Sequence, residues 1–197
     1  DLPECLNRIS EVVRQHPGNY FARCWLATSY DHLRFREDAK EAFRAAIRMR
    51  PNEPWAWNDL GTLYKQERRH RRAMTCFRRA TRARVDFAPA WANIGILHRD
   101  AGEETRELAA YREGLRHADD DGRWSGLADA LRERGRPEEA LDAYRRALAL
   151  RPDHAFTLLN LGRLLLWDLE RPREALAAYQ RAADVMPQFP MPWEGLA

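Results

Sequence analysis

The sequence repeats itself at an interval of 34 residues. The segment Trp57–Gly61 reads WNDLG, and Trp91–Gly95 reads WANIG at the same place one interval later. Leu161 and Gly162 repeat the end of this pattern further along the chain. A fixed interval of this size is typical of arrays in which each unit is one small element of supersecondary structure stacked on its neighbours. The period therefore predicts a stacked array rather than a fold with a single central core.

The apolar and small residues within one interval have helical spacing. Residues three or four apart lie on one face of an α-helix, whereas a strand would need alternation. In the second interval the spaced residues form two groups, one being Trp57, Leu60, Gly61 and Tyr64 and the other Ala73, Phe77 and Ala80. Each interval is therefore predicted to form two amphipathic helices.

This pattern resembles the tetratricopeptide repeat, whose signature is Trp-x2-Leu-Gly-x2-Tyr, then Ala-x3-Phe, then a proline near the end of the unit. The resemblance covers nearly the whole chain. It implies an all-α fold, an α-α superhelix (solenoid) of about five helix-turn-helix units with half-units at both ends. The expected units are 1–19 (second helix of a partial repeat), 20–53, 54–87, 88–120, 121–154, 155–189 and 190–197 (start of a truncated sixth unit).

Two units depart from the signature. Unit 88–120 is the most degenerate, since His98 takes the tyrosine place and Glu107 the first alanine place, and we expect it to be the loosest. Unit 155–189 needs one extra residue near Trp167. No polar capping sequence is visible at the C-terminal end, and terminal repeats normally need one. We therefore expect either further repeats or self-association through that end.

Composition limits the remaining classes. The 33 basic and 30 acidic residues leave a net charge of only +3, which is too small by itself to predict nucleic-acid binding. The longest stretch without a formal charge, 87–98, is well short of the roughly 20 residues of a membrane-spanning helix. We expect no membrane insertion and no leader peptide. The widely spaced Cys5, Cys24 and Cys76 favour a reducing, cytoplasmic environment over a disulfide scaffold.

Sequence motifs of enzymes are absent. The chain has no glycine-rich phosphate loop, no Gly-x-Ser-x-Gly elbow and no His-Glu-x-x-His pair. Its six histidines are scattered without the spacing of metal ligands. We therefore expect no catalytic activity, no cofactor and no metal site.

The family resemblance implies a concave groove lined by the first helices of successive units. The groove residues that we expect to bind a peptide are Asn58, Asp59, Thr62, Lys65, Asn93, Arg99, Arg132, Phe156, Asn160, Arg163 and Trp167. Asn93 and Asn160 take the place of the asparagine ladder that grips peptide backbone in long arrays such as O-GlcNAc transferase. Trp25, Asp59 and Gly126 interrupt that ladder here. The residues of the two-carboxylate clamp found in chaperone-binding relatives are missing.

An arginine-rich run extends from Arg68 to Val85 without any acidic residue. Its first part, Arg68, Arg69, Arg71 and Arg72, is a candidate anion-binding edge. The alternative is that acidic residues in the next unit, among them Glu103 and Glu107, pair with these arginines across stacked turns.

We interpret the chain as a non-catalytic scaffold that binds a protein or peptide partner. One alternative is a substrate-recruiting or regulatory part of a larger enzyme resembling O-GlcNAc transferase. An adaptor for nucleic acid or another polyanion, acting through the arginine run, is favoured least. The apolar groove residues Phe156, Leu159, Leu166 and Trp167 could hold a partner's apolar side chain or pack against a second copy of the chain.

Overall fold

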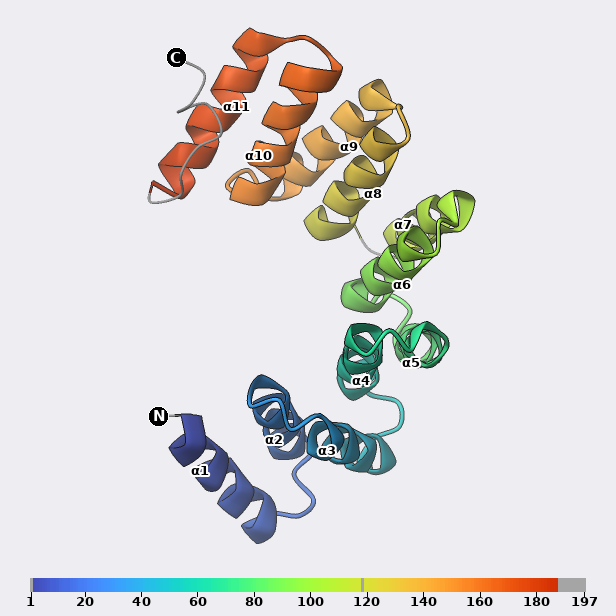
Figure 1. Ribbon diagram of the computed structural model, residues 1–197, viewed down its shortest axis with the longest axis vertical. Coiled ribbons are helices and arrows are strands. Elements are labelled where there is room, and N and C mark those ends of the chain that lie inside the picture. Colours follow the sequence, from blue (N-terminus) through green and yellow to red (C-terminus); the bar gives the residue numbers. More distant parts are fainter. Residues whose placement is uncertain (1, 118, 188–197) are drawn as a thin grey trace. The chain divides into compact units, whose positions relative to one another are not determined.

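The computed structural model describes residues 2–117 and 119–187. Over these residues the chain forms eleven α-helices and one π-helical turn, and it contains no strand there (Figure 1). The elements are α1 (Leu2–Gln15), α2 (Tyr20–His32), α3 (Arg36–Met49), α4 (Pro54–Gln66), α5 (His70–Ala83), α6 (Ala88–Asp100), α7 (Glu104–His117), α8 (Asp121–Glu133), α9 (Pro137–Leu150), α10 (Ala155–Arg163), η1 (Leu164–Asp168) and α11 (Pro172–Val185). The predicted all-α fold is confirmed. The expected sixth unit, 190–197, lies outside the described residues.

The chain divides into two compact units, 1–97 and 98–197, with the boundary inside α6. In the first unit α2 packs on α3 and α4 packs on α5, each pair forming a hairpin. In the second unit α8 packs on α9 and α10 packs on α11. The first helices begin at Tyr20, Pro54, Ala88, Asp121 and Ala155, which are the first residues of the five expected repeats. We retain those boundaries as the proposed repeats.

Glycine allows the two helices of a hairpin to approach closely. A Cβ atom built on Gly61 in α4 would lie 2.6 Å from the ring of Phe77 in α5. One built on Gly162 in α10 would lie 2.5 Å from the ring of Tyr179 in α11. Phe77 is fully buried, so its ring has little room to move away. An aromatic ring from the partner helix therefore packs directly against the glycine of the repeat pattern.

Each turn between paired helices contains a residue with a positive φ angle. Gly102 and Gly135 have φ of 70° and 66°, and Arg34, Arg68 and Glu170 adopt the same conformation with φ of 67°, 57° and 54°. A residue in this region ends a helix by redirecting the chain after its last turn. Glycine adopts it without strain, whereas a side chain raises its energy. Three of the five turns therefore keep their geometry despite an unfavourable residue.

The π-helical turn η1 continues α10. The amide of Leu169 donates to the carbonyl of Leu164, five residues earlier, at 3.1 Å. A π turn accommodates one residue more than an α-helical turn. The extra residue that the sequence predicts near Trp167 is accommodated here.

Side chains also connect one hairpin to the next. The Lys40 ammonium, which is 1% exposed, contacts Glu37 and Glu67 at 2.7 Å each. In the second unit the fully buried Glu107 pairs with Arg134. The alanine place of the degenerate repeat is thus occupied by a buried ion pair, and burial raises the pKa of Glu107 although Arg134 opposes the shift.

The tryptophans of the repeat pattern are only partly buried. Trp57, Trp91 and Trp124 are half-buried rather than core residues. The indole N–H of Trp57 donates to the Pro51 carbonyl at 2.9 Å, and that of Trp91 donates to the Val85 carbonyl at 2.7 Å. The polar edge of the ring needs a hydrogen-bond acceptor, which keeps it near the loop that precedes the helix. Trp193 lies outside the described residues. No helix among the described residues has the length and apolar character needed to cross a membrane.

We predict that Gly61→Ala and Gly162→Ala each destabilise the fold. The added methyl group would overlap a buried aromatic ring, and overpacking of this kind costs about 1–3 kcal/mol, more than the helix propensity of alanine returns. Urea unfolding followed by circular dichroism measures the change. Gly18→Ala is the matched control, because no atom lies within 4 Å of its Cβ position. Equal stability of all three variants would contradict the close-packing account.

We also predict opposite effects for two turn substitutions. Gly135→Ala should destabilise the protein by about 1 kcal/mol, since it places a Cβ in the left-handed region. Arg34→Gly should stabilise it by a smaller amount, because relief of that strain is partly offset by the greater freedom of glycine in the unfolded chain. Thermal unfolding midpoints measure both changes, and a lower midpoint for Arg34→Gly would contradict the prediction.

Candidate functional site

A chain of polar side chains connects α4 to α6 within the first unit. The amide nitrogen of Asn93 donates to the amide oxygen of Asn58 at 3.0 Å, and Asn58 in turn donates to Asp59 at 3.1 Å. The Lys65 ammonium donates to the amide oxygen of Asn93 at 2.9 Å. We call these four residues the polar ladder. Four of the predicted groove residues are therefore brought together.

The polar ladder fixes its amides in defined orientations. Asn58 is 7% exposed and Asn93 is half-buried, so neither side chain is free to rotate in water. An amide group has two donor hydrogens and two acceptor positions, and Asn93 uses one of each within the ladder. One donor and one acceptor of Asn93 remain, which matches the N–H and C=O of a peptide backbone.

The surroundings of Asp59 disfavour the ionised form of its carboxyl group. Burial raises the pKa of its carboxyl group, and the nearby negative charge of Asp31 adds to the shift. The hydrogen bond from Asn58 acts in the opposite direction without cancelling the rise. The first unit therefore holds an acidic group that would be stabilised by a donor or a positive charge from a partner.

Exposed aromatic side chains also lie on the first helices of the first unit. Phe21 and Trp25 on α2 are 51% and 64% exposed, and Trp55 on α4 is 46% exposed. Trp55 contacts the ring of Phe87 edge-on, with centroids 4.8 Å apart, and the guanidinium of Arg50 lies over Phe21. These contacts hold the rings in place while leaving part of their surface open.

A second polar cluster connects α8, α9 and α10 in the second unit. Asp129 accepts a hydrogen bond from the Tyr144 hydroxyl and another from Asn160 at 3.1 Å. Burial raises the pKa of Asp129 and that of Tyr144, and the Tyr144 hydrogen bond lowers the former without cancelling the rise. Arg132 lies 3.7 Å from the carboxylate of Asp168 in η1. Asn160 thus bonds to the half-buried Asp129, while Arg132 approaches Asp168.

The other predicted groove residues differ in what they offer. Phe156 and Trp167 are 59% and 68% exposed, and Arg163 is also exposed. The positive charge of Arg99 acts on Glu107 and Asp129. The Thr62 hydroxyl donates to the carbonyl of Asn58, four residues earlier in the same helix, at 3.2 Å, so its hydrogen is not available to a partner.

Asp129 and Tyr144 were not among the predicted site residues. The repeat register places Asp129 on the groove stripe and Tyr144 at the Phe position of the second helix, and their pairing depends on the closeness of the two helices. The repeat register places Phe21 and Trp55 on the face expected to line the groove, and Trp25 at an interrupted place of the ladder, although none of the three was among the residues expected to bind a peptide. Their recurrence near the start of first helices is a signal that the sequence does contain.

The four arginines of the predicted anion-binding edge line one shallow depression of about 470 Å3, together with His70. Arg69 lies 3.3 Å from the Glu67 carboxylate. Glu103 pairs with Arg106 at 2.9 Å, and Glu107 pairs with Arg134. Glu103 and Glu107, which were considered as partners for the edge, therefore pair with arginines of the second compact unit, 98–197.

Metal-ligating side chains are not clustered. In the part of the chain that the structure describes, no group of three or more His, Cys, Asp or Glu residues is placed to hold an ion. Cys24 and Cys76 are free thiols, and burial raises the pKa of each to about 11. Neither is therefore a thiolate near neutral pH.

Stacked helical hairpins with polar and aromatic residues along their first helices define a helical-repeat protein. The chain belongs to the tetratricopeptide repeat family, because models of that repeat match residues 22–53, 58–122 and 124–188. These matches cover most of the sequence, and they agree with the resemblance found from the signature residues.

Solved structures of repeat proteins share the fold. A chain of the APC/C heterotetramer Cut9-Hcn1 matches with a TM-score of 0.75 and 15% identity over 95% of this chain. TTC0263, a thermophilic tetratricopeptide repeat protein of Thermus thermophilus, matches with a TM-score of 0.70 and 21% identity over 84% of this chain and 91% of its own. YrrB, described as having an unusual peptide-binding site, matches with a TM-score of 0.57 and 17% identity over 91% of this chain and 93% of its own.

At these identities the likeness concerns the fold alone. The chain spans 38% of the matched chain of Cut9-Hcn1. No curated protein matches the sequence.

We predict that Asp59→Asn stabilises the protein at neutral pH. A carboxyl group whose folded pKa is raised binds its proton more tightly in the folded state, so stability falls as the pH rises through its titration range. Asparagine removes the buried charge and still accepts the hydrogen bond from Asn58. Thermal unfolding should show a higher midpoint for the variant at pH 7 and a smaller difference in acid, where the aspartate is protonated. A variant less stable than the wild type at both pH values would contradict the assignment.

Proposed function

We propose that this chain is a non-catalytic scaffold that binds an extended protein segment along its first helices. The observation that carries the proposal is the distribution of exposed aromatic residues among the described residues. Apart from Phe35, these all lie on first helices or on η1, namely Phe21, Trp25, Trp55, Phe156 and Trp167. Large apolar groups left in water at recurrent positions are typical of a surface that is covered by a partner.

The polar ladder supplies the other half of such a site. Extended segments present a backbone N–H and C=O at regular intervals, and these groups need partners when they leave water. Asn93 has a donor and an acceptor available within a rigid hydrogen-bonded chain. The aromatic residues would take apolar side chains of the segment while the amide holds its backbone.

Several features support binding over catalysis. Asp59 and Asp129 have raised pKa values, but each is engaged with a neighbouring amide or hydroxyl, and neither has a nucleophile beside it among its contacts. YrrB, which shares the fold, is described as having a peptide-binding site. A reducing compartment such as the cytoplasm is compatible with the free thiols of Cys24 and Cys76.

The test begins with peptides selected from a random phage-displayed library on the full chain. We predict that the selected peptides bind the Trp25→Ala/Asn93→Ala variant about tenfold more weakly, because it removes one aromatic contact and one backbone contact. Fluorescence polarisation of labelled peptides measures the dissociation constants.

The matched control is Phe35→Ala/Asn52→Ala. It removes an exposed aromatic ring and an exposed amide from loops outside the first helices. Its affinity should stay within about twofold of wild type. Equal weakening of both variants, or selected peptides that bind both as well as wild type, would count against a site on the first helices.

A further inference from the structure

A cleft of about 530 Å3 lies among α3, α4 and α5 in the first unit. Its floor contains Ile47, Trp57, Leu60, Tyr64 and Cys76. The floor residues of α4 recur three and four positions apart, as on one face of a helix, and they are not the residues of the polar ladder. The cleft and the ladder therefore use different faces of the same helix.

The rim of this cleft is strongly basic. Arg44 and Arg48 come from α3, Arg71 and Arg72 come from α5, and no Asp or Glu lines the cleft. Arg44 donates to the Tyr64 hydroxyl at 2.8 Å, and Arg72 lies over the Tyr64 ring at 5.7 Å from its centroid. Both contacts are to an uncharged group.

Counterions for these arginines are scarce. Within the described ranges none of the four forms a salt bridge with a carboxylate. The charge of Arg44 does act on Glu37, but that carboxylate is bonded to the Lys40 ammonium at 2.7 Å. Like charges held together around an apolar cleft repel one another, and an anion placed among them would relieve the repulsion.

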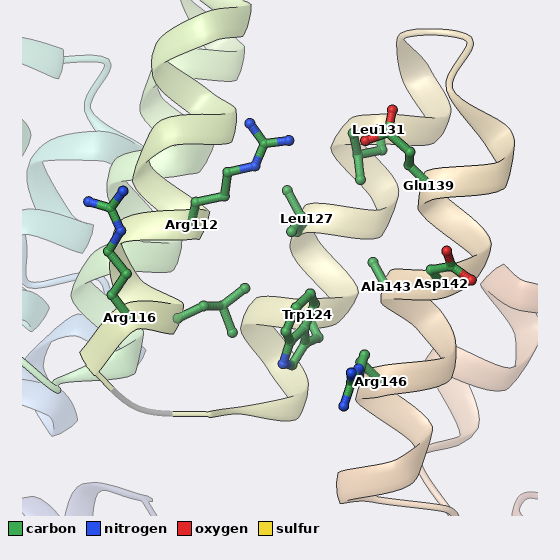
Figure 2. A pocket seen from close by; sticks show the side chains of 10 residues that line it. Arg112, Arg116, Trp124, Leu127, Leu131, Glu139, Asp142, Ala143 and Arg146 are labelled. Carbon is green, nitrogen blue, oxygen red and sulfur yellow. The ribbon is translucent and has the colours of Figure 1, made fainter.

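The second unit contains the corresponding cleft, and there two carboxylates face three arginines, Arg112, Arg116 and Arg146. This cleft, of about 560 Å3, lies among α7, α8 and α9. Figure 2 shows Arg112 and Arg116 on α7, Trp124 on α8, and Glu139 and Asp142 on α9 around one opening. Its two carboxylates both come from α9, so this cleft contains acidic groups opposite the arginines of α7.

The difference between the two clefts lies on the second helix of the later hairpin. In the repeat register Arg72 corresponds to Glu139, and Thr75 corresponds to Asp142. The first turn of α5 contains no acidic residue, whereas the first turns of α3, α7, α9 and α11 all contain one or two. Acidic residues stabilise the N-terminal turn of a helix, and α5 has basic residues there instead. The same arrangement of helices therefore occurs once with two acidic residues in the cleft lining and once with none.

We propose that the cleft among α3, α4 and α5 is a second binding site, for an acidic protein segment that inserts one large apolar side chain. The four arginines would pair with its carboxylates, since the guanidinium fork matches a carboxylate in geometry and charge. The apolar floor would take the inserted side chain, and the volume is within the range of ordinary ligand pockets.

The aromatic rings of the floor argue against a nucleic acid as the occupant. Single-stranded nucleic acids bind by stacking bases on open aromatic faces. Tyr64 is only 6% exposed, and the cations of Lys40 and Arg72 lie 5.9 Å and 5.7 Å from the centroid of its ring. Trp57 packs against Ala80 and Phe87 and is half-buried. Neither ring offers a free face for a base.

The test uses a fluorescein-labelled peptide of aspartate and glutamate residues around one phenylalanine, with the full chain in dilute salt. The variant Arg72→Glu/Thr75→Asp gives this cleft the acidic residues that the second unit has naturally, so the fold is expected to tolerate it. We expect it to weaken binding about tenfold or more in fluorescence polarisation. A peptide with alanine in place of phenylalanine should also bind about tenfold more weakly.

The matched control is Arg78→Glu/Arg82→Ala, which makes the same change in net charge on α5 with residues outside the cleft lining. It should bind within about twofold of wild type. Equal loss in both variants would overturn the proposal, and so would equal affinity for the phenylalanine and alanine peptides. If a labelled oligothymidine bound more tightly than the acidic peptide, and the cleft variant weakened that binding, the site would be assigned to nucleic acid instead. Retention of acidic-peptide binding by Trp25→Ala/Asn93→Ala would separate this site from the first-helix site.

Discussion

Every part of this structure depends on the close approach of two helices within a hairpin. A single amphipathic helix cannot bury its apolar face, so it needs a partner, and two such helices need a neighbouring pair. The approach is possible because glycine or alanine on one helix faces an aromatic ring on the other, as with Gly61 and Phe77 or Gly162 and Tyr179. Once a pair is closed, the outward faces of its helices are fixed in direction. The surfaces that we propose for binding therefore follow from this contact.

The fold could be predicted from the sequence because the residues that determine it recur. Trp57, Leu60 and Tyr64 specify one helix, and the corresponding residues of other units repeat the information at a fixed interval. Stacking of neighbours follows from a physical need that is the same in each unit. The extra residue near Trp167 was also readable, since a helix can take in an extra residue only by widening a turn.

The proposed binding surface could be predicted only in part. The repeat register identified Asn58 and Asn93 as groove residues, but not that their amides bond to each other or that Lys65 completes the chain. Those contacts depend on how side chains of two neighbouring hairpins are oriented toward each other, and the repeat register does not specify these orientations. The arginine run was visible in the sequence, yet its relation to an apolar floor was not, because Arg44 and Arg72 come together only when α3 and α5 flank α4. The local sequence pattern determines which residues share one face of a helix. Which faces of different helices lie together is known only from the three-dimensional structure.

The π turn at Leu164–Asp168 also affects the numbering of positions along the last hairpin. Each residue of an α-helix is rotated by about 100° from the one before it, so an inserted residue turns everything that follows to a new direction. Asp168, the last residue of the π turn, lies near Arg132 and would point elsewhere in an uninterrupted helix. A comparison of repeats by constant length would thus assign the wrong side chains to the surface after Leu164. In this family, register has to be counted in turns of helix as well as in residues.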